Sequence, residues 1–138
     1  MEYKVYLKTN ALGHIVEINS SAFLTDLTGW TEIACGDGDK YHHPQDYFLP
    51  LGYTDENGIA NYKYSDGEIV PRTAADKADE LAKLVALREI EELKAALAAT
   101  DYISIKIAEG AATHEEYAEQ IAQRAGWRAR INELEGTL

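Results

Sequence analysis

The sequence predicts an α+β fold: a small antiparallel β domain over residues 1–72, built of hairpins, followed by a helical region over residues 73–138. Two observations carry this prediction. Seven of the nine tyrosines and both phenylalanines precede Pro71, whereas Ala, Leu, Glu and Lys dominate after it. The spacing of apolar residues also changes from a period of two to a helical period. A length of 138 residues suits one ordinary domain or two small ones.

The β domain is predicted from alternation and turn residues. Residues 2–8 alternate, with one apolar face, and TNALG supplies a turn before residues 14–20 return as a second strand. Residues 28–36 form a candidate third strand. The clearest hairpin spans residues 60–72, because Ser-Asp-Gly at its centre ends in Gly67, which can adopt the positive φ of a tight turn.

A helix is predicted over residues 74–100, with Thr73 as its N-cap and Asp76 three residues later. Its apolar residues fall on two opposite sides: Leu81, Leu84 and Val85 on one, and Leu87, Ile90, Leu93 and Leu97 on the other. Either the first turns pack on the β domain and the last turns on the next helix, or the first part also forms an intermolecular seam. We favour the first interpretation, because the pattern is shorter than the three or four heptads of a coiled coil.

The last helix is predicted over residues 114–135, beginning at a capping box of Thr113 and Glu116. Gly126 weakens the middle of this helix relative to alanine, but it also allows a neighbour to approach closely. The segment 100–110 is ambiguous, since its β-branched residues favour a strand while its flanking cap and glycine favour a short helix. We favour the helix.

The net charge of −11 excludes some classes of partner. Acidic residues are spread over both halves, so phosphate backbones and anionic lipids would be repelled, and we expect neither nucleic-acid nor membrane binding. No apolar run is long enough to span a bilayer, and the N-terminus lacks the apolar core of a signal peptide. One cysteine excludes an intrachain disulfide. We therefore expect a protein that is made in a cytoplasm and is soluble there.

The stretch GDGDKYHH, residues 36–43, contains groups that could bind a metal. A zinc site needs three or four ligands at defined spacing, and a second Cys- or His-containing arm is missing. Adjacent histidines would point to opposite faces of a strand, and no glutamate completes a calcium loop. We interpret residues 36–39 as a tight turn and predict no metal and no cofactor.

Catalytic groups are equally sparse. Cys35 could be paired with His42 or His43, and an acid pair could be drawn from Asp37, Asp39 or Asp46. Neither lies in a sequence context typical of a nucleophile or of a paired acid and base. We predict that the protein is not an enzyme.

Exposed aromatic residues suit recognition of proteins or sugars, although a thin β domain also needs tyrosines in its core. The candidate interaction residues are Trp30, Asp39, Tyr41, His42, His43, Tyr47, Tyr62, Tyr64, Trp127 and Arg128.

Nearly the whole chain resembles small XkdW-like proteins encoded beside tail-fibre genes in phages and prophages of Gram-positive bacteria. Its layout is loosely similar to that of tail-fibre assembly proteins. The resemblance rests on GWTEIACGDGDKYHHPQDYF, GIANYKYSDGEIVPRTAAD, ATDYISIKIAEG and EEYAEQIAQRAGWRARINELE. The most specific parts are GDKYHH and the pattern of Arg124, Trp127-Arg128 and Ile131-Asn132. Pro44 departs from the small residue expected after the histidine pair.

The resemblance implies a structural or assembly protein of a phage tail that contacts a larger tail-fibre or baseplate protein, in the host cytoplasm during assembly or in the virion tail. A dimer or trimer is compatible with this role. The aromatic residues favour an alternative, a receptor- or carbohydrate-binding module of a tail tip. The acidity suggests a further alternative, an anti-defence inhibitor that mimics nucleic acid.

Overall fold

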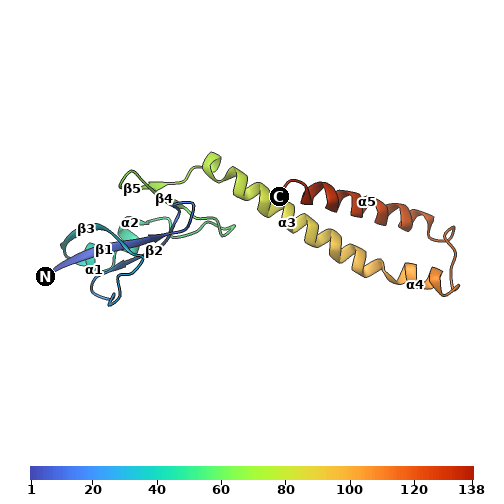
Figure 1. Cartoon of the computed structure of the whole chain (residues 1–138), viewed down its shortest axis with the longest axis horizontal. Coiled ribbons are helices and arrows are strands. Elements are labelled where there is room, and N and C mark those ends of the chain that lie inside the picture. The colour runs from blue at the N-terminus through green and yellow to red at the C-terminus, as the bar shows by residue number, and fades with distance from the viewer. The chain divides into compact units, whose positions relative to one another are not determined.

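The computed structural model describes all 138 residues, and the chain divides into two compact units, Met1–Ala78 and Asp79–Leu138. The first unit holds the strands and two short helices, and the second holds helices only, so the predicted α+β class is confirmed (Figure 1). The division falls six residues beyond the predicted boundary, because the first turn of the long helix is attached to the β unit.

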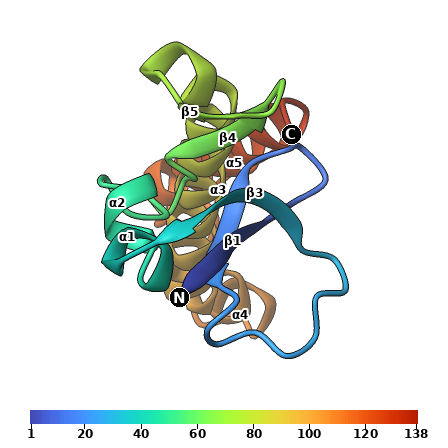
Figure 2. The ribbon, with the colours of Figure 1, turned by 90° about the vertical axis from the view of Figure 1, so that its left-hand side faces the viewer.

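The main sheet has three antiparallel strands, β1 (Glu2–Thr9), β2 (Ile15–Ser20) and β3 (Thr31–Asp37), in the order β2-β1-β3. Figure 2 shows β1 and β3 beside each other in this unit. The predicted hairpin turn forms because the Asn10 carboxamide oxygen accepts hydrogen bonds from the amides of Leu12 and His14, at 2.9 and 3.1 Å. All three predicted strands are therefore present.

A second hairpin joins β4 (Tyr62–Ser65) to β5 (Glu68–Pro71), as predicted. Asp66 and Gly67 both have positive φ, 52° and 78°, which is the conformation of a type I′ turn. This turn matches the right-handed twist of the two strands and so fixes their register.

The core of the β unit lies on one face of β1, the central strand of the main sheet. Its buried residues are Val5, Leu7, Ile15, Ile18, Leu49 and Tyr62. Burying an aliphatic side chain of this kind contributes about 1.5–3 kcal/mol. Tyr6 points to the opposite face and is also buried, so β1 is covered on both sides at its centre.

Buried polar groups attach the start of the long helix α3 (Ala74–Thr100) to the β unit. The Arg72 side chain is 2% exposed and donates to the carbonyl of Ala60 and to Asp76. The Lys77 ammonium donates to Asp55 at 2.9 Å and to the Asn61 carboxamide oxygen at 2.8 Å. These bonds join the loop before β4 and the end of β5 to the start of α3. We call Asp55, Asn61, Arg72, Asp76 and Lys77 the α3 anchor.

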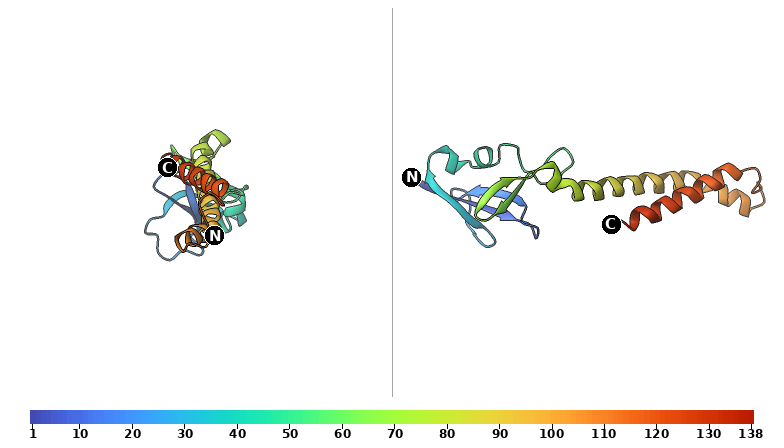
Figure 3. Two further views of the ribbon diagram at one scale, coloured as in Figure 1. Left: turned by 90° about the vertical axis from the view of Figure 1, so that its right-hand side faces the viewer. Right: turned by 90° about the horizontal axis from the view of Figure 1, so that it is seen from above.

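The helical unit contains the rest of α3, the short helix α4 (Tyr102–Ala108) and α5 (Ala118–Glu135). Helices α3 and α5 lie antiparallel and side by side in the views of Figures 1 and 3. Their shared core consists of Ala86, Ile90, Ile131 and Leu134, with Leu93 and Leu97 packed against it. The predicted bounds of α3 and the helical state of segment 102–108 are confirmed.

Two helix predictions are wrong in detail. The last helix begins at Ala118 and not at residue 114, because Thr113 caps only a turn: its hydroxyl accepts the Glu116 amide at 3.3 Å, and Tyr117 is the N-cap of the helix. Leu87 is 47% exposed, and Ala86 occupies the core in its place.

Leu81 and Val85 are 38% and 52% exposed, and Leu84 is half-buried. We call these three residues the α3 stripe.

No helix has the length and apolar content needed to cross a membrane.

Candidate functional site

The candidate site in the β unit begins where β3 ends. Gly38 has a φ of 99°, which residues with a side chain rarely adopt, and it turns the chain into helix α1 (Asp39–His42). The Gly38 carbonyl accepts the amides of Tyr41 and His42, and the Asp39 carbonyl accepts the amide of His43 at 2.7 Å. Pro44 follows and keeps His43 out of the helical conformation.

The structure corrects our interpretation of GDGDKYHH. Gly36 and Asp37 belong to β3, so residues 36–39 form a strand end and a helix start, and not an isolated tight turn. The two histidines do not diverge as they would in a strand, because the segment is helical. The rings of His42 and His43 have centroids 4.2 Å apart, and one ligand atom each of Asp39, His42 and His43 lie within 4.8 Å of one another.

Aromatic rings surround the histidines. The His42 ring meets Tyr3 and Phe23 edge-on, with centroid distances of 5.0 and 4.9 Å, and the His43 ring lies 5.5 Å from Phe23. Phe23 itself is 54% exposed. These contacts restrict the orientation of the imidazoles from the side of β1 and of the loop after β2.

Asp39 is held from the next helix, α2 (Gln45–Phe48). The Tyr47 hydroxyl donates to the Asp39 carboxylate at 2.8 Å. This hydrogen bond, together with the negative charge of Asp39, raises the pKa of Tyr47 above its ordinary value. The phenol therefore stays protonated and available as a donor to the carboxylate.

Tyr41 packs α1 on the sheet. Its ring lies so close to Gly36 that a Cβ atom at position 36 would be 2.5 Å from the Tyr41 Cε2 atom. Tyr41 also contacts the core of the β unit and the Phe48 ring. It is a structural residue that positions the two histidines.

The remaining aromatic candidates are less exposed than we expected. Tyr62 is 3% exposed and belongs to the core, where its hydroxyl accepts the Leu51 amide at 3.0 Å. Tyr64 packs against that core. Trp30 is half-buried with the Lys8 ammonium 4.7 Å from its ring centre. Tyr62 is therefore not an exposed contact residue, because its position in β4 points it inward.

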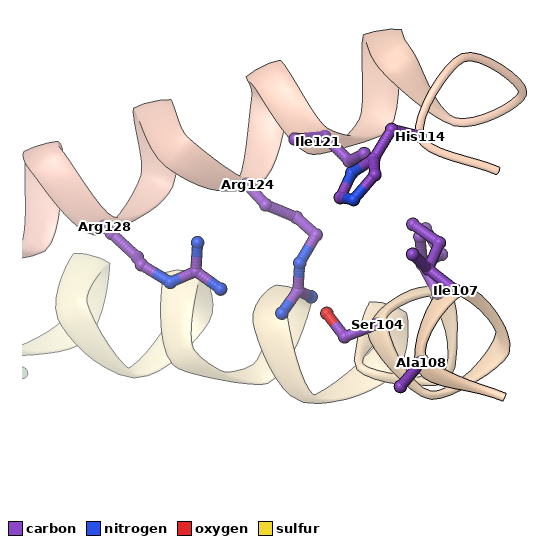
Figure 4. A pocket seen from close by; sticks show the side chains of 8 residues that line it. Ser104, Ile107, Ala108, His114, Ile121, Arg124 and Arg128 are labelled. Carbon is purple, nitrogen blue, oxygen red and sulfur yellow. The ribbon is translucent and has the colours of Figure 1, made fainter.

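A pocket of about 260 Å³ lies in the helical unit, among α4, α5 and the loop between them. Figure 4 shows Arg124 and Arg128 reaching from α5 along one side, with Ser104, Ile107 and His114 around the space. The volume is just below the roughly 300 Å³ at which small-molecule sites begin.

The Arg124 guanidinium forms hydrogen bonds within its own chain. Its side chain is 6% exposed, and it donates to the Leu97 carbonyl, the Thr100 hydroxyl and the Asp101 carboxylate. Arg128 is exposed and Trp127 is half-buried, so these two predicted interaction residues of α5 differ in accessibility. Every buried side-chain nitrogen or oxygen has a hydrogen-bond partner. The pocket thus presents Arg128, and not Arg124, as its available cation.

Sequence reasoning missed Tyr3 and Phe23 as neighbours of the histidines, and Arg124 as the polar centre of the helix pairing. The position of Arg124, three residues after Ile121 and seven before Ile131, placed it within the apolar stripe of α5. A charged residue within an apolar stripe predicts a buried side chain with hydrogen-bond partners on the neighbouring helix, and this signal could have identified Arg124.

Comparison of the chain with protein-family models, with curated proteins and with solved structures gives no match.

Proposed function

We propose that this protein is a structural or assembly protein of a phage tail that acts by binding a larger tail-fibre or baseplate protein. The observation that carries the proposal is the α3 stripe, whose Leu81 and Val85 are exposed although both are apolar. Its three residues lie at spacings of three and four along one helix, the arrangement by which an amphipathic helix docks into an apolar groove of a partner.

The helical unit supports this role through its thin core. Four buried residues hold two long helices together, and much of their surface remains available for another chain. Burial of the stripe on a partner would contribute about 25 cal/mol per Å² of apolar surface before the costs of association. The XkdW-like resemblance, which covers nearly the whole chain, supplies the class of partner.

The test is co-expression with the tail-fibre and baseplate proteins of the same phage or prophage, followed by purification through a tag on the partner. We expect a stable complex with one of these proteins. The double variant Leu81→Asp/Val85→Asp should abolish it, because two charges would be buried without partners. Ala122→Asp, which adds the same charge at an exposed position of α5, should leave the complex intact.

A failure of every tail protein to co-purify would contradict the proposal. Saturable quenching of Trp30 or Trp127 fluorescence by cell-wall glycans, without such a complex, would instead support the receptor- or carbohydrate-binding alternative. Trp30 is half-buried beneath Lys8, so binding at this residue would first have to displace the lysine.

A further inference from the structure

Asp39, His42 and His43 form a cluster that binding through α3 does not require. We propose that these three side chains bind one divalent transition-metal ion of the zinc, cobalt or nickel class, with the Asp39 carboxylate and both imidazoles as ligands. The proposal goes beyond the tail-protein function and does not depend on it, because it concerns a different unit of the chain.

The spacing of Asp39, His42 and His43 along the chain favours a shared site. Relative to Asp39, the histidines occupy positions three and four residues later, and residues at these spacings lie on the same side of a helical turn. The turn is closed by the hydrogen bond from the His43 amide to the Asp39 carbonyl. The helical turn Asp39–His42, with His43 as its C-cap residue, therefore places three candidate ligands in one region of space.

The distances between the candidate ligand atoms are close to those around a bound ion. Neighbouring ligand atoms of a tetrahedral zinc ion lie about 3.3 Å apart, at bond lengths of about 2.0–2.2 Å. The three candidate ligand atoms all lie within 4.8 Å of one another. Asp39 and His43 are exposed and His42 is half-buried, so small side-chain rotations close the remaining gap without disturbing the core.

The identity of the ligands selects the class of metal. Two imidazole nitrogens and one carboxylate suit zinc, cobalt and nickel, whereas calcium and magnesium prefer oxygen ligands throughout. Three protein ligands leave a fourth position for water or for a group from a partner. An adjoining pocket of about 290 Å³ provides room for it, and the oxygen-bearing side chains of Asn19, Gln45 and Asp46 line that pocket with the histidines.

The surroundings also favour a cation. The Tyr47 hydroxyl donates to the Asp39 carboxylate, which is the kind of outer hydrogen bond that orients a metal-binding carboxylate. The ammonium of Lys40, which follows Asp39 in α1, lies over the rings of Tyr41 and Phe48 at 5.7 and 5.0 Å and so is occupied away from the Asp39 carboxylate. The chain as a whole carries a charge of −11.

The experiment is a titration of the full chain, stripped of metal with a chelator, with Co²⁺ followed by its visible absorption and with Zn²⁺ followed by calorimetry. We expect one ion per chain. His43→Gln and Asp39→Asn should each weaken binding by about tenfold or more, and Tyr47→Phe by about tenfold, as for other outer-shell partners. Imidazole resonances of His42 and His43 should shift on zinc addition, and those of His14 and His114 should not.

His114→Gln is the matched control, because His114 is exposed in the other unit and its loss should leave the affinity and the stoichiometry unchanged. Circular dichroism of each variant establishes that it is folded. Absence of saturable uptake by the parent chain would overturn the proposal. So would uptake that His43→Gln leaves unchanged, or uptake that His114→Gln reduces to the same extent.

Discussion

Gly36 lies inside a strand and Gly126 inside a helix, but they differ in the space available for a Cβ atom. At Gly36 in β3 the Tyr41 ring occupies the space of a Cβ atom, whereas at Gly126 in α5 nothing lies within 4 Å of that position. Our expectation that Gly126 allows the close approach of a neighbour is therefore wrong. Gly36 is required by packing, and Gly126 is a weak point of its helix.

Alanine at the two positions should have effects of opposite sign. Gly36→Ala should lower the free energy of unfolding of the β unit by about 1–3 kcal/mol, because Tyr41 has to leave its place. Gly126→Ala should raise that of the helical unit by about 0.5–1 kcal/mol, because alanine restricts the unfolded chain and favours helix. Urea denaturation followed by circular dichroism measures both. Equal effects of the two substitutions would contradict the packing argument.

The residues that sequence reasoning placed correctly act through their immediate neighbours. Thr73 caps α3 through its hydroxyl, 3.2 Å from the Asp76 amide, and Gly67 completes its turn. The residues that it misplaced depend on contacts distant in the chain. His42 is oriented by Tyr3, and Tyr62 is buried by residues of β1 and β2. A strand or helix assignment alone could not supply those neighbours.

At the scale of elements, Arg124 joins α5 to the end of α3. The last carbonyl groups of a helix have no partners within it, and the helix dipole makes this end negative. Arg124 donates to the Leu97 carbonyl at 2.7 Å and to the Asp101 carboxylate at 2.7 Å, and so supplies both hydrogen bonds and charge. The pairing of these helices thus combines an apolar seam with one buried cation.

Arg124→Met should therefore destabilise the helical unit by about 2–3 kcal/mol, since the part-buried acceptors at the end of α3 lose their donor while the apolar stem of the side chain is retained. Arg124→Lys should recover part of this loss, because an ammonium keeps the charge but cannot match the planar guanidinium. Thermal denaturation followed by circular dichroism reports the change. Arg128→Met, at an exposed position, should stay within about 0.5 kcal/mol of the parent, and a larger loss there than at Arg124 would refute the assignment.

The α3 anchor links the stability of the β unit to pH. A hydrogen bond from Lys77, assisted by the amides of Ile59 and Asn57, lowers the pKa of Asp55 below its ordinary value. A depressed folded-state pKa means that the stabilisation is complete above the unfolded value, about 3.9, and is lost as the pH falls through the folded value.

Asp55→Asn should accordingly lower the urea midpoint of the β unit at pH 7, and the difference from the parent should shrink by pH 3. Asp46→Asn serves as the control, because Asp46 is exposed on α2 and its loss should not change the midpoint. A difference between Asp55→Asn and the parent that is the same at both pH values would show that the ion pair with Lys77 does not stabilise the unit.

At the scale of the whole molecule, the chain builds two separate cores, in the two parts of the sequence that differ in composition and in the spacing of apolar residues. The tyrosine-rich half folds around Val5 and Leu7, and the alanine- and leucine-rich half around Ile90 and Ile131. The division itself was displaced because the α3 anchor ties the first turn of α3 to the β unit through Arg72 and Lys77. Hydrogen bonds between distant residues are not encoded in a local pattern, which is why this boundary could not be placed from the sequence.

The length of the exposed stripe predicts the oligomeric state. The α3 stripe covers only residues 81–85, far less than the three or four heptads of a stable coiled coil, and the charge of −11 opposes association of identical chains. We expect light scattering coupled to size exclusion to give a monomer of 15.3 kDa. A monomer fits an adaptor or assembly helper whose stripe is covered by another protein. A trimeric mass that Val85→Asp returns to the monomer would instead make the stripe an intermolecular seam and favour a permanent component of a threefold fibre.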